Sequence, residues 1–187
     1  MKVELITKKE CGNSVVFVFK EHLNEQPKGS VKTEHQRVIV RKCLSEILNR
    51  KNVNLEHLDN GAPFLPDFPD QYISISHSKQ WYAIQLSTVD EVGVDIQLIK
   101  ENIYEGRSYF INHEEQKNFD LTILNLNLIW SAKEALYKLK KGKVEHYKDS
   151  ITVIKIEGNE IIGKVDSDII PCGYMILDGT VLVFVNQ

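Results

Sequence analysis

The spacing of hydrophobic residues changes along the chain, and each spacing predicts a different kind of element. Between residues 34 and 50 the apolar side chains recur every three or four positions, which predicts an amphipathic helix. Its apolar face consists of Val40, Leu44, Ile47 and Leu48. Arg37 and Arg41 lie one turn apart on the same helix. Residues 60–70 hold three of the five prolines and therefore predict a loop.

Beyond this loop the period falls to two, which indicates strands at residues 72–76, 81–88 and 92–98. Turns are expected at residues 77–80 and 90–91. In the third strand Asp95 and Gln97 share one face with Gly93, while the opposite face is apolar throughout.

Two helices and a strand-rich tail complete the pattern. A short helix is expected at residues 112–121, with Asn112 as its cap. A longer helix at residues 128–141 ends at Gly142, and Glu134 and Lys138 lie one turn apart on it. Its buried stripe is formed by Ala132, Ala135, Leu136 and Leu139. The tail, residues 150–185, predicts a meander of hairpins, so the whole chain is expected to be α+β.

Composition narrows the class of protein. With 42% hydrophobic and 26% charged residues, the chain can form one sizeable core or two small packed lobes. No apolar run approaches the roughly 20 residues of a membrane span, and the first ten residues lack the apolar centre of a secretory signal, so a cytoplasmic protein without membrane contact is expected. The net charge of −3 argues against a nucleic-acid binder. The three scattered cysteines suggest neither a disulfide framework nor a zinc site.

Four polar residues are candidates for chemistry, and each also has a purely structural explanation. Asp95 lies in an apolar strand, where a carboxylate is uncommon unless it is paired, exposed or bound to a ligand. Glu134 can form an ordinary surface ion pair with Lys138. His77 can be a hydrogen-bonding turn residue, and Glu114 can complement a helix dipole.

The order and spacing of these residues form a series of motifs. The series is Gly61-x-Pro63, Ile73-Ser74-Ile75-Ser76-His77-Ser78, Trp81, Gly93-Val94-Asp95-Ile96, Phe110-x-x-x-Glu114 and Trp130-Ser131-Ala132-Lys133-Glu134-Ala135-Leu136-x-Lys138. It resembles the 4′-phosphopantetheinyl transferase superfamily in its longer, single-chain form. The match extends over roughly residues 35–142, and its last motif is the most specific.

The resemblance implies a single domain with an α+β, sandwich-like fold over residues 1–187. Two similar lobes, approximately residues 1–93 and 94–187, would be related by a pseudo-twofold axis, each a helix packed on antiparallel strands. Coenzyme A would bind between them and donate its phosphopantetheine arm to a serine of an apo acyl or peptidyl carrier protein. Because both lobes lie in one chain, a monomer is expected.

The resemblance also implies roles for individual residues. Asp95 and Glu134 match metal-binding carboxylates, for Mg²⁺ or alternatively Mn²⁺. Lys138 matches a catalytic lysine that reaches the pyrophosphate, and Glu114 a carboxylate proposed to accept the serine proton. The residues implied to contact coenzyme A are His77, Ser76, Pro63, Arg37 and Arg41.

Two positions depart from the family pattern. Gln97 stands where many members have a glutamate as third metal ligand, and an amide oxygen can still coordinate, although without charge. Ala62 stands where many members have a phosphate-binding lysine. These departures leave two alternatives open: a silent relative that binds coenzyme A or a carrier domain without transfer, and another metal-dependent phosphoryl enzyme such as a pyrophosphatase.

Overall fold

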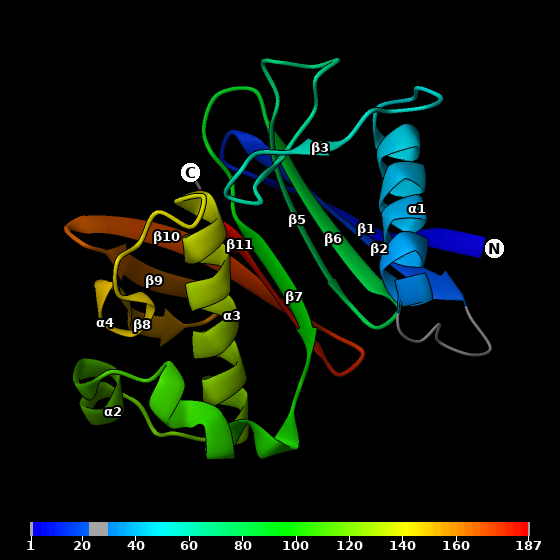
Figure 1. Ribbon diagram of the computed structural model, residues 1–187. Helices are drawn as coiled ribbons and strands as arrows, with labels where there is room; N and C mark the ends of the chain where they lie inside the picture. The colour runs from blue at the N-terminus through cyan, green and yellow to red at the C-terminus, as the bar shows by residue number, and fades with distance from the viewer. Residues whose placement is uncertain (1, 23–29, 187) are drawn as a thin grey trace.

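The computed structural model describes residues 2–22 and 30–186. Over these residues the fold is α+β, as predicted, with a four-stranded and a five-stranded antiparallel sheet, a two-stranded ribbon and few helices (Figure 1). The helices of the described residues include none that is long and apolar enough to cross a membrane.

The first sheet has the strand order β1-β2-β6-β5. Its strands are β1 (Lys2–Cys11), β2 (Ser14–His22), β5 (Tyr72–Ser78) and β6 (Trp81–Ser87). The strands predicted at residues 72–76 and 81–88 are confirmed, but the expected turn at residues 77–80 is shorter, because His77 and Ser78 still belong to β5. The strands β1 and β2 were not predicted.

The helix α1 (Ser30–Ile47) packs on this sheet and confirms the helix expected from residue 34. Its apolar stripe includes Ile39, Val40 and Leu44, which are buried against side chains of β2, β5 and β6. This packing fixes which face of α1 is turned outward.

The second sheet has the strand order β7-β11-β10-β9-β8. Its strands are β7 (Val94–Leu98), β8 (Ile151–Glu157), β9 (Glu160–Val165), β10 (Asp168–Leu177) and β11 (Thr180–Val185). The predicted meander is therefore confirmed, and β7 joins it by pairing with the last strand, β11. The helix α3 (Ile123–Leu139) packs on one face of this sheet through the predicted stripe, and it begins five residues earlier than expected.

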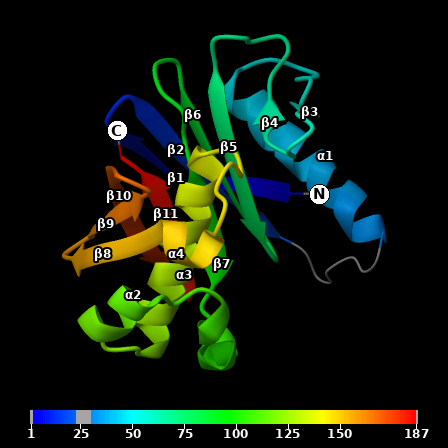
Figure 2. The ribbon, with the colours of Figure 1, turned by 60° about the vertical axis from the view of Figure 1, so that its left-hand side comes forward.

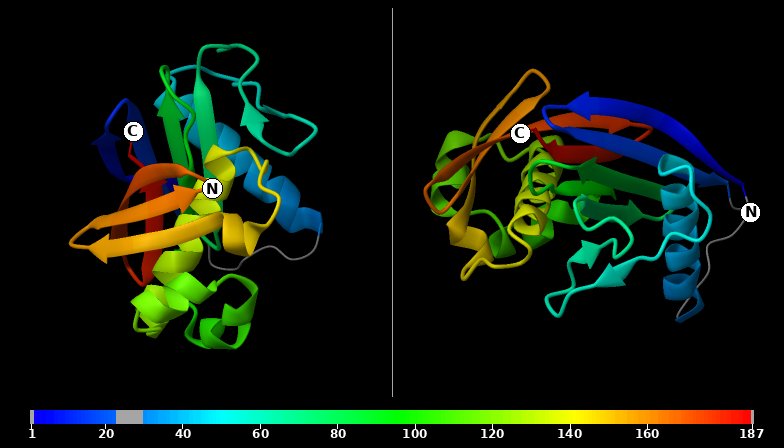
Figure 3. Two further views of the ribbon diagram at one scale, coloured as in Figure 1. Left: turned by 90° about the vertical axis from the view of Figure 1, so that its left-hand side faces the viewer. Right: turned by 90° about the horizontal axis from the view of Figure 1, so that it is seen from above.

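A third apolar cluster joins the two sheets. Val18 and Trp81 from the first sheet pack with Ile96 and Phe184 from the second. Figures 1 and 2 show β5, β6 and β7 between α1 and α3. In both views of Figure 3 the strands β8 and β9 lie on the side of α3 away from α1. The edge strands β5 and β7 thereby meet at the centre of the molecule.

Smaller elements complete the fold. They are β3 (Glu56–His57), β4 (Pro63–Phe64), a 3-10 helix at Glu101–Tyr109, α2 (His113–Asn118) and α4 (Tyr147–Ser150). The loop predicted at residues 60–70 thus contains one short strand, β4, which pairs with β3 to form a ribbon beside α1 (Figure 2). Asn112 caps α2 as predicted, in a reciprocal capping box with Glu115.

Candidate functional site

A glycine allows β7 and α3 to approach closely enough to form the site. A Cβ built on Gly93 would lie 2.1 Å from the backbone oxygen of Ala135, which is far inside van der Waals contact. Only a residue without a side chain fits there. The next residues on the same face of β7, Asp95 and Gln97, are therefore held directly against α3.

Three alternating serines of β5 connect this edge strand to β7. The hydroxyl oxygens of Ser74 and Ser78 accept hydrogen bonds from the backbone N–H groups of Val94 (3.1 Å) and Leu98 (3.3 Å). The middle serine, Ser76, donates to the carboxylate of Asp95 at 2.8 Å. The three serines thus supply hydrogen-bond acceptors for backbone N–H groups of β7 and position Asp95.

Asp95 is 7% exposed, and three donors from two elements hold its carboxylate. Besides Ser76, Lys138 Nζ donates to Oδ1 at 2.8 Å and Ser131 Oγ donates to Oδ2 at 2.7 Å. Lys138 Nζ also donates to the backbone oxygen of Val94 at 3.0 Å. The structure therefore brings together Asp95, Lys138 and Ser76, as the motifs predicted.

Glu134 lies one turn before Lys138 on α3 and is half-buried. Its Oε1 accepts a hydrogen bond of 2.7 Å from the hydroxyl of Tyr147. Partial burial is the main cause that raises the pKa of Glu134, and the negative charge of Asp95 raises it further, while the hydrogen bond from Tyr147 and the charges of Lys138 and Lys100 oppose the shift. The electrostatic influence of Asp95 on Glu134 indicates that the two carboxylates lie near each other.

This donor set fits a hard divalent cation. Mg²⁺ and Mn²⁺ prefer oxygen ligands, and Mg²⁺ often binds through one or two carboxylates and substrate phosphates. Gln97 Nε2 donates to the backbone oxygen of Asn127 at 3.3 Å, and its Oε1 takes part in no hydrogen bond with the described residues. Across residues 2–22 and 30–186 no three His, Cys, Asp or Glu side chains form a metal-binding group, so two carboxylates and the Gln97 amide are the candidate ligands.

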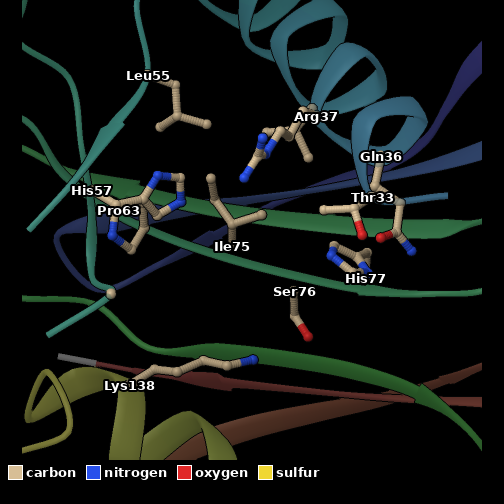
Figure 4. Close-up of a pocket in the computed structure, with 12 residues that line it drawn as sticks. Thr33, Gln36, Arg37, Leu55, His57, Pro63, Ile75, Ser76, His77 and Lys138 are labelled. Carbon is tan, nitrogen blue, oxygen red and sulfur yellow. The ribbon is translucent and has the colours of Figure 1, made fainter. Parts of the chain in front are cut away.

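A pocket of about 510 Å³ opens beside this cluster (Figure 4). It lies between α1, the β3–β4 ribbon and β5, and its volume is in the range of small-molecule sites. Of the residues implied by the resemblance, Arg37, Pro63, Ser76, His77 and Lys138 line it. A second hollow of about 200 Å³ shares Gly61, Pro63, Ile75 and Lys138 with it, so the two adjoin and together line one side of the cleft.

His77 points into this pocket from β5. Partial desolvation is the main cause that lowers the pKa of His77, and the positive charge of Lys138 adds to it. The ring lies 5.9 Å from that of Tyr82, centroid to centroid. In the free protein the imidazole is therefore biased toward its neutral form.

Two predicted residues lie outside the cluster. Arg41 is exposed on α1 and does not line the pocket. Glu114 is exposed on α2 and has no hydrogen-bond or ion-pair partner among the described residues. The roles implied for both stay predictions.

The neighbouring Glu115 is the acidic residue of α2 that faces inward. Its side chain is fully buried and lies 2.9 Å from Lys133 Nζ, which is fully buried as well. Burial raises the pKa of Glu115 and lowers that of Lys133, while the attraction between them opposes both shifts. This pair was not predicted, although the spacing Asn112-x-x-Glu115 is a capping-box signal.

The sequence analysis also missed several pocket residues. Thr33, Gln36 and His57 line the pocket, and Ser131 and Tyr147 hold the two carboxylates. Thr33 lies one turn before Arg37, and Gln36 lies three residues after Thr33, so the helical period could have grouped each of them with a neighbour in the pocket. His57 and Tyr147 gave no sequence signal, since each lies in an element too short to show a hydrophobic period.

Comparison with curated proteins shows that the chain is similar to 4′-phosphopantetheinyl transferases, which confirms the resemblance predicted from the motifs. No family model matches the chain. One relative, the 4′-phosphopantetheinyl transferase ffp of Bacillus subtilis, is 27% identical over 147 residues, which cover 72% of this chain and 63% of the relative.

Two further relatives carry the same description. The 4′-phosphopantetheinyl transferase Sfp of Bacillus subtilis (strain 168) is 28% identical over 57% of this chain and 50% of its own length. The 4′-phosphopantetheinyl transferase gsp of Aneurinibacillus migulanus is 32% identical over 54% of this chain and 44% of its own length. The chain thus spans about half the length of the curated relatives it matches.

Proposed function

We propose that this protein transfers the 4′-phosphopantetheine group of coenzyme A to a serine of an apo carrier protein and releases 3′,5′-adenosine bisphosphate. The observation that carries the proposal is the cluster of Asp95, Glu134 and Lys138 at the edge of a pocket that also contains Arg37 and His77. Carboxylates for a cation and basic groups for phosphates are what cleavage of a pyrophosphate requires.

The basic side chains have separate tasks in this proposal. Lys138 places its ammonium group against the pyrophosphate, where it remains close to Asp95. Arg37 and His77 bind phosphate oxygens on the nucleotide side of the cleft, where Ser76 and Pro63 complete the wall. The pKa of His77 is lowered in the free protein, and a bound phosphate would favour its protonation.

Asp95 and Glu134 would hold a divalent cation, Mg²⁺ or Mn²⁺, with Gln97 as the candidate third ligand. When bound, the cation would neutralise charge that develops on the pyrophosphate as the bond to the leaving group breaks. The three donors around Asp95 keep its carboxylate oriented for this task.

The serine proton needs an acceptor, and Glu114 stays the proposed one. Its exposure on α2 leaves it accessible to a docked carrier protein. Glu114→Gln should lower kcat while leaving the KM for coenzyme A unchanged, with Glu145→Gln as an exposed control. An unchanged kcat would remove Glu114 from the mechanism.

The acceptor would be a small acidic helical carrier domain, acyl or peptidyl, that docks near the cleft, and the protein would act as a monomer. Chromatography of the nucleotide product tests the reaction. Release of 3′,5′-adenosine bisphosphate should require both the divalent cation and an apo carrier protein. Release without any acceptor would indicate a hydrolase, and binding without release would indicate a silent relative.

A further inference from the structure

The β3–β4 ribbon contributes an imidazole to the pocket at the place where the chain departs from its relatives. Ala62 occupies the position of a phosphate-binding lysine in many members of the resembled family. The backbone there is fixed, because Leu58 N–H donates to Ala62 O at 2.9 Å and Gly61 N–H donates to Leu58 O at 2.8 Å. Gly61 has φ +82°, which suits this tight turn. The methyl side chain of Ala62 gives the cleft no charge.

His57 lies next to this position on the opposite strand. It pairs with Pro63 in the β3–β4 register, and both residues line the pocket. His57 is exposed and has no hydrogen-bond or ion-pair partner among the described residues. An imidazole carries at least one N–H donor in either protonation state. A donor is therefore available where the lysine is missing.

Arg37 supplies the positive charge on the facing wall. Its only ion pair among the described residues is with Glu34 at 3.6 Å, and both side chains are more than half exposed, so this pair is weak. Figure 4 shows the guanidinium of Arg37 and the ring of His57 both directed into the pocket, with Lys138 reaching it from another wall. The lining also includes the apolar side chains of Val40, Leu55 and Ile75.

The two ends of the cleft thus differ in chemistry. At one end Lys138 lies beside two carboxylates, the arrangement suited to a pyrophosphate held with a cation. At the other end Arg37 and His57 line a pocket without a carboxylate in its lining, while Glu91 lines only the adjoining hollow, where it pairs with Lys141. Such an end suits a phosphate monoester. Coenzyme A carries one phosphate group of each kind.

We propose that His57, with Arg37, binds the ribose 3′-phosphate of coenzyme A and takes the place of the lysine that Ala62 lacks. This rests on the proposed function for the identity of the ligand, but it concerns binding alone. His57 is then a specificity-determining residue that distinguishes coenzyme A from its 3′-dephospho form.

The test is a calorimetric titration of the full chain with coenzyme A and with 3′-dephospho-coenzyme A. His57→Ala should weaken coenzyme A binding by about 10-fold, the effect of one lost hydrogen bond to a charged group, and should change 3′-dephospho-coenzyme A binding by less than about 2-fold. Ala62→Lys in the His57→Ala background should recover most of the lost affinity. His146→Ala, an exposed histidine whose side chain caps nothing, is the matched control and should change neither value.

Two outcomes would overturn the assignment: equal weakening for both ligands, which places His57 against another part of the molecule, or no weakening for either. Because the readout is binding, it is independent of turnover. If the protein transfers the arm to a carrier protein but His57→Ala weakens both ligands equally or neither, only the role of His57 is refuted. Discrimination without transfer refutes the proposed reaction and leaves the role of His57 intact.

Discussion

Lys138 Nζ lies 2.8 Å from Asp95 Oδ1, so one ion pair joins the last turn of α3 to the edge strand β7. The side chain of Lys138 is 27% exposed and that of Asp95 is 9% exposed, which means that the pair is sheltered but still reaches the pocket. The ammonium group also donates to the backbone oxygen of Val94. Lys138 therefore has a structural role in holding β7 against α3 and a proposed catalytic role in the pocket.

Glu134→Gln should lower the transfer rate by about 100-fold or more, because it removes one of two negative charges from the proposed cation site. Folding should be retained, since the amide keeps the shape of the side chain and ends its repulsion with Asp95. Steady-state kinetics and thermal unfolding measure the two effects. Near-normal turnover would refute the assignment of Glu134 as a ligand, and Glu145→Gln serves as the exposed control.

The charge of Lys138 should be visible in the titration of His77. Lys138→Met should raise the pKa of His77 toward its ordinary value of 6.5, since one of the two main causes of its depression is removed. Lys141→Met, which removes a lysine paired instead with Glu91, should leave it unchanged. NMR titration of the His77 ring measures both, and equal shifts in the two variants would contradict the account.

The same histidine predicts the direction of a pH effect on stability. Because folding lowers the pKa of His77, the unfolded chain takes up the proton first as the pH falls. His77 should therefore cost stability below about pH 6.5, and this cost levels off below the folded pKa. Denaturant unfolding from pH 7.5 to pH 5 should show a smaller loss for His77→Gln than for the wild type. A larger loss of stability in the variant would mean that His77 stabilises the protein at low pH, which would contradict the account.

Gly93→Ala should destabilise the protein by about 3 kcal/mol or more, because the new methyl group would collide with the backbone of Ala135. A shift of β7 away from α3 would also displace Asp95 from Lys138. Gly106→Ala, where a Cβ has no neighbour within 4 Å, should have little effect on urea unfolding. Equal effects of the two substitutions would argue against close contact between β7 and α3.

Lys133→Met should destabilise the protein by about 3–5 kcal/mol, since it leaves Glu115 buried without its cation. The double variant Lys133→Met, Glu115→Gln should be more stable than Lys133→Met alone. A double-mutant cycle in urea measures the coupling. Additive effects would mean that the two side chains do not interact.

The sequence predicted α1, α2, α3 and most strands, largely because the apolar spacing of the longer elements is regular. The strand β1 was not predicted because five lysines and glutamates are spread along a largely exposed edge strand, which weakens its hydrophobic signal. His77 was placed in a turn because the polar run at residues 76–80 resembles a loop, whereas Ser74, Ser76 and Ser78 in fact bind β7 through their hydroxyl groups.

The candidate site was predictable as a set of residues, but not as a geometry. The motifs named Asp95, Glu134 and Lys138, yet nothing in the sequence showed that Gly93 brings β7 against α3. Phe110-x-x-x-Glu114 likewise drew attention to an exposed carboxylate, while the buried one is the next residue. Such one-residue differences depend on which side of a short helix faces the core.

Intact-mass spectrometry of an apo carrier protein tests the central claim most directly. Incubation with this protein, coenzyme A and Mg²⁺ should add one phosphopantetheine group, about 340 Da from the chemistry of the transferred arm. The gain should disappear with a chelator or with a carrier whose acceptor serine is replaced by alanine. No gain on several acyl and peptidyl carriers, despite measurable coenzyme A binding, would contradict the proposed transfer and identify the protein as a silent binder.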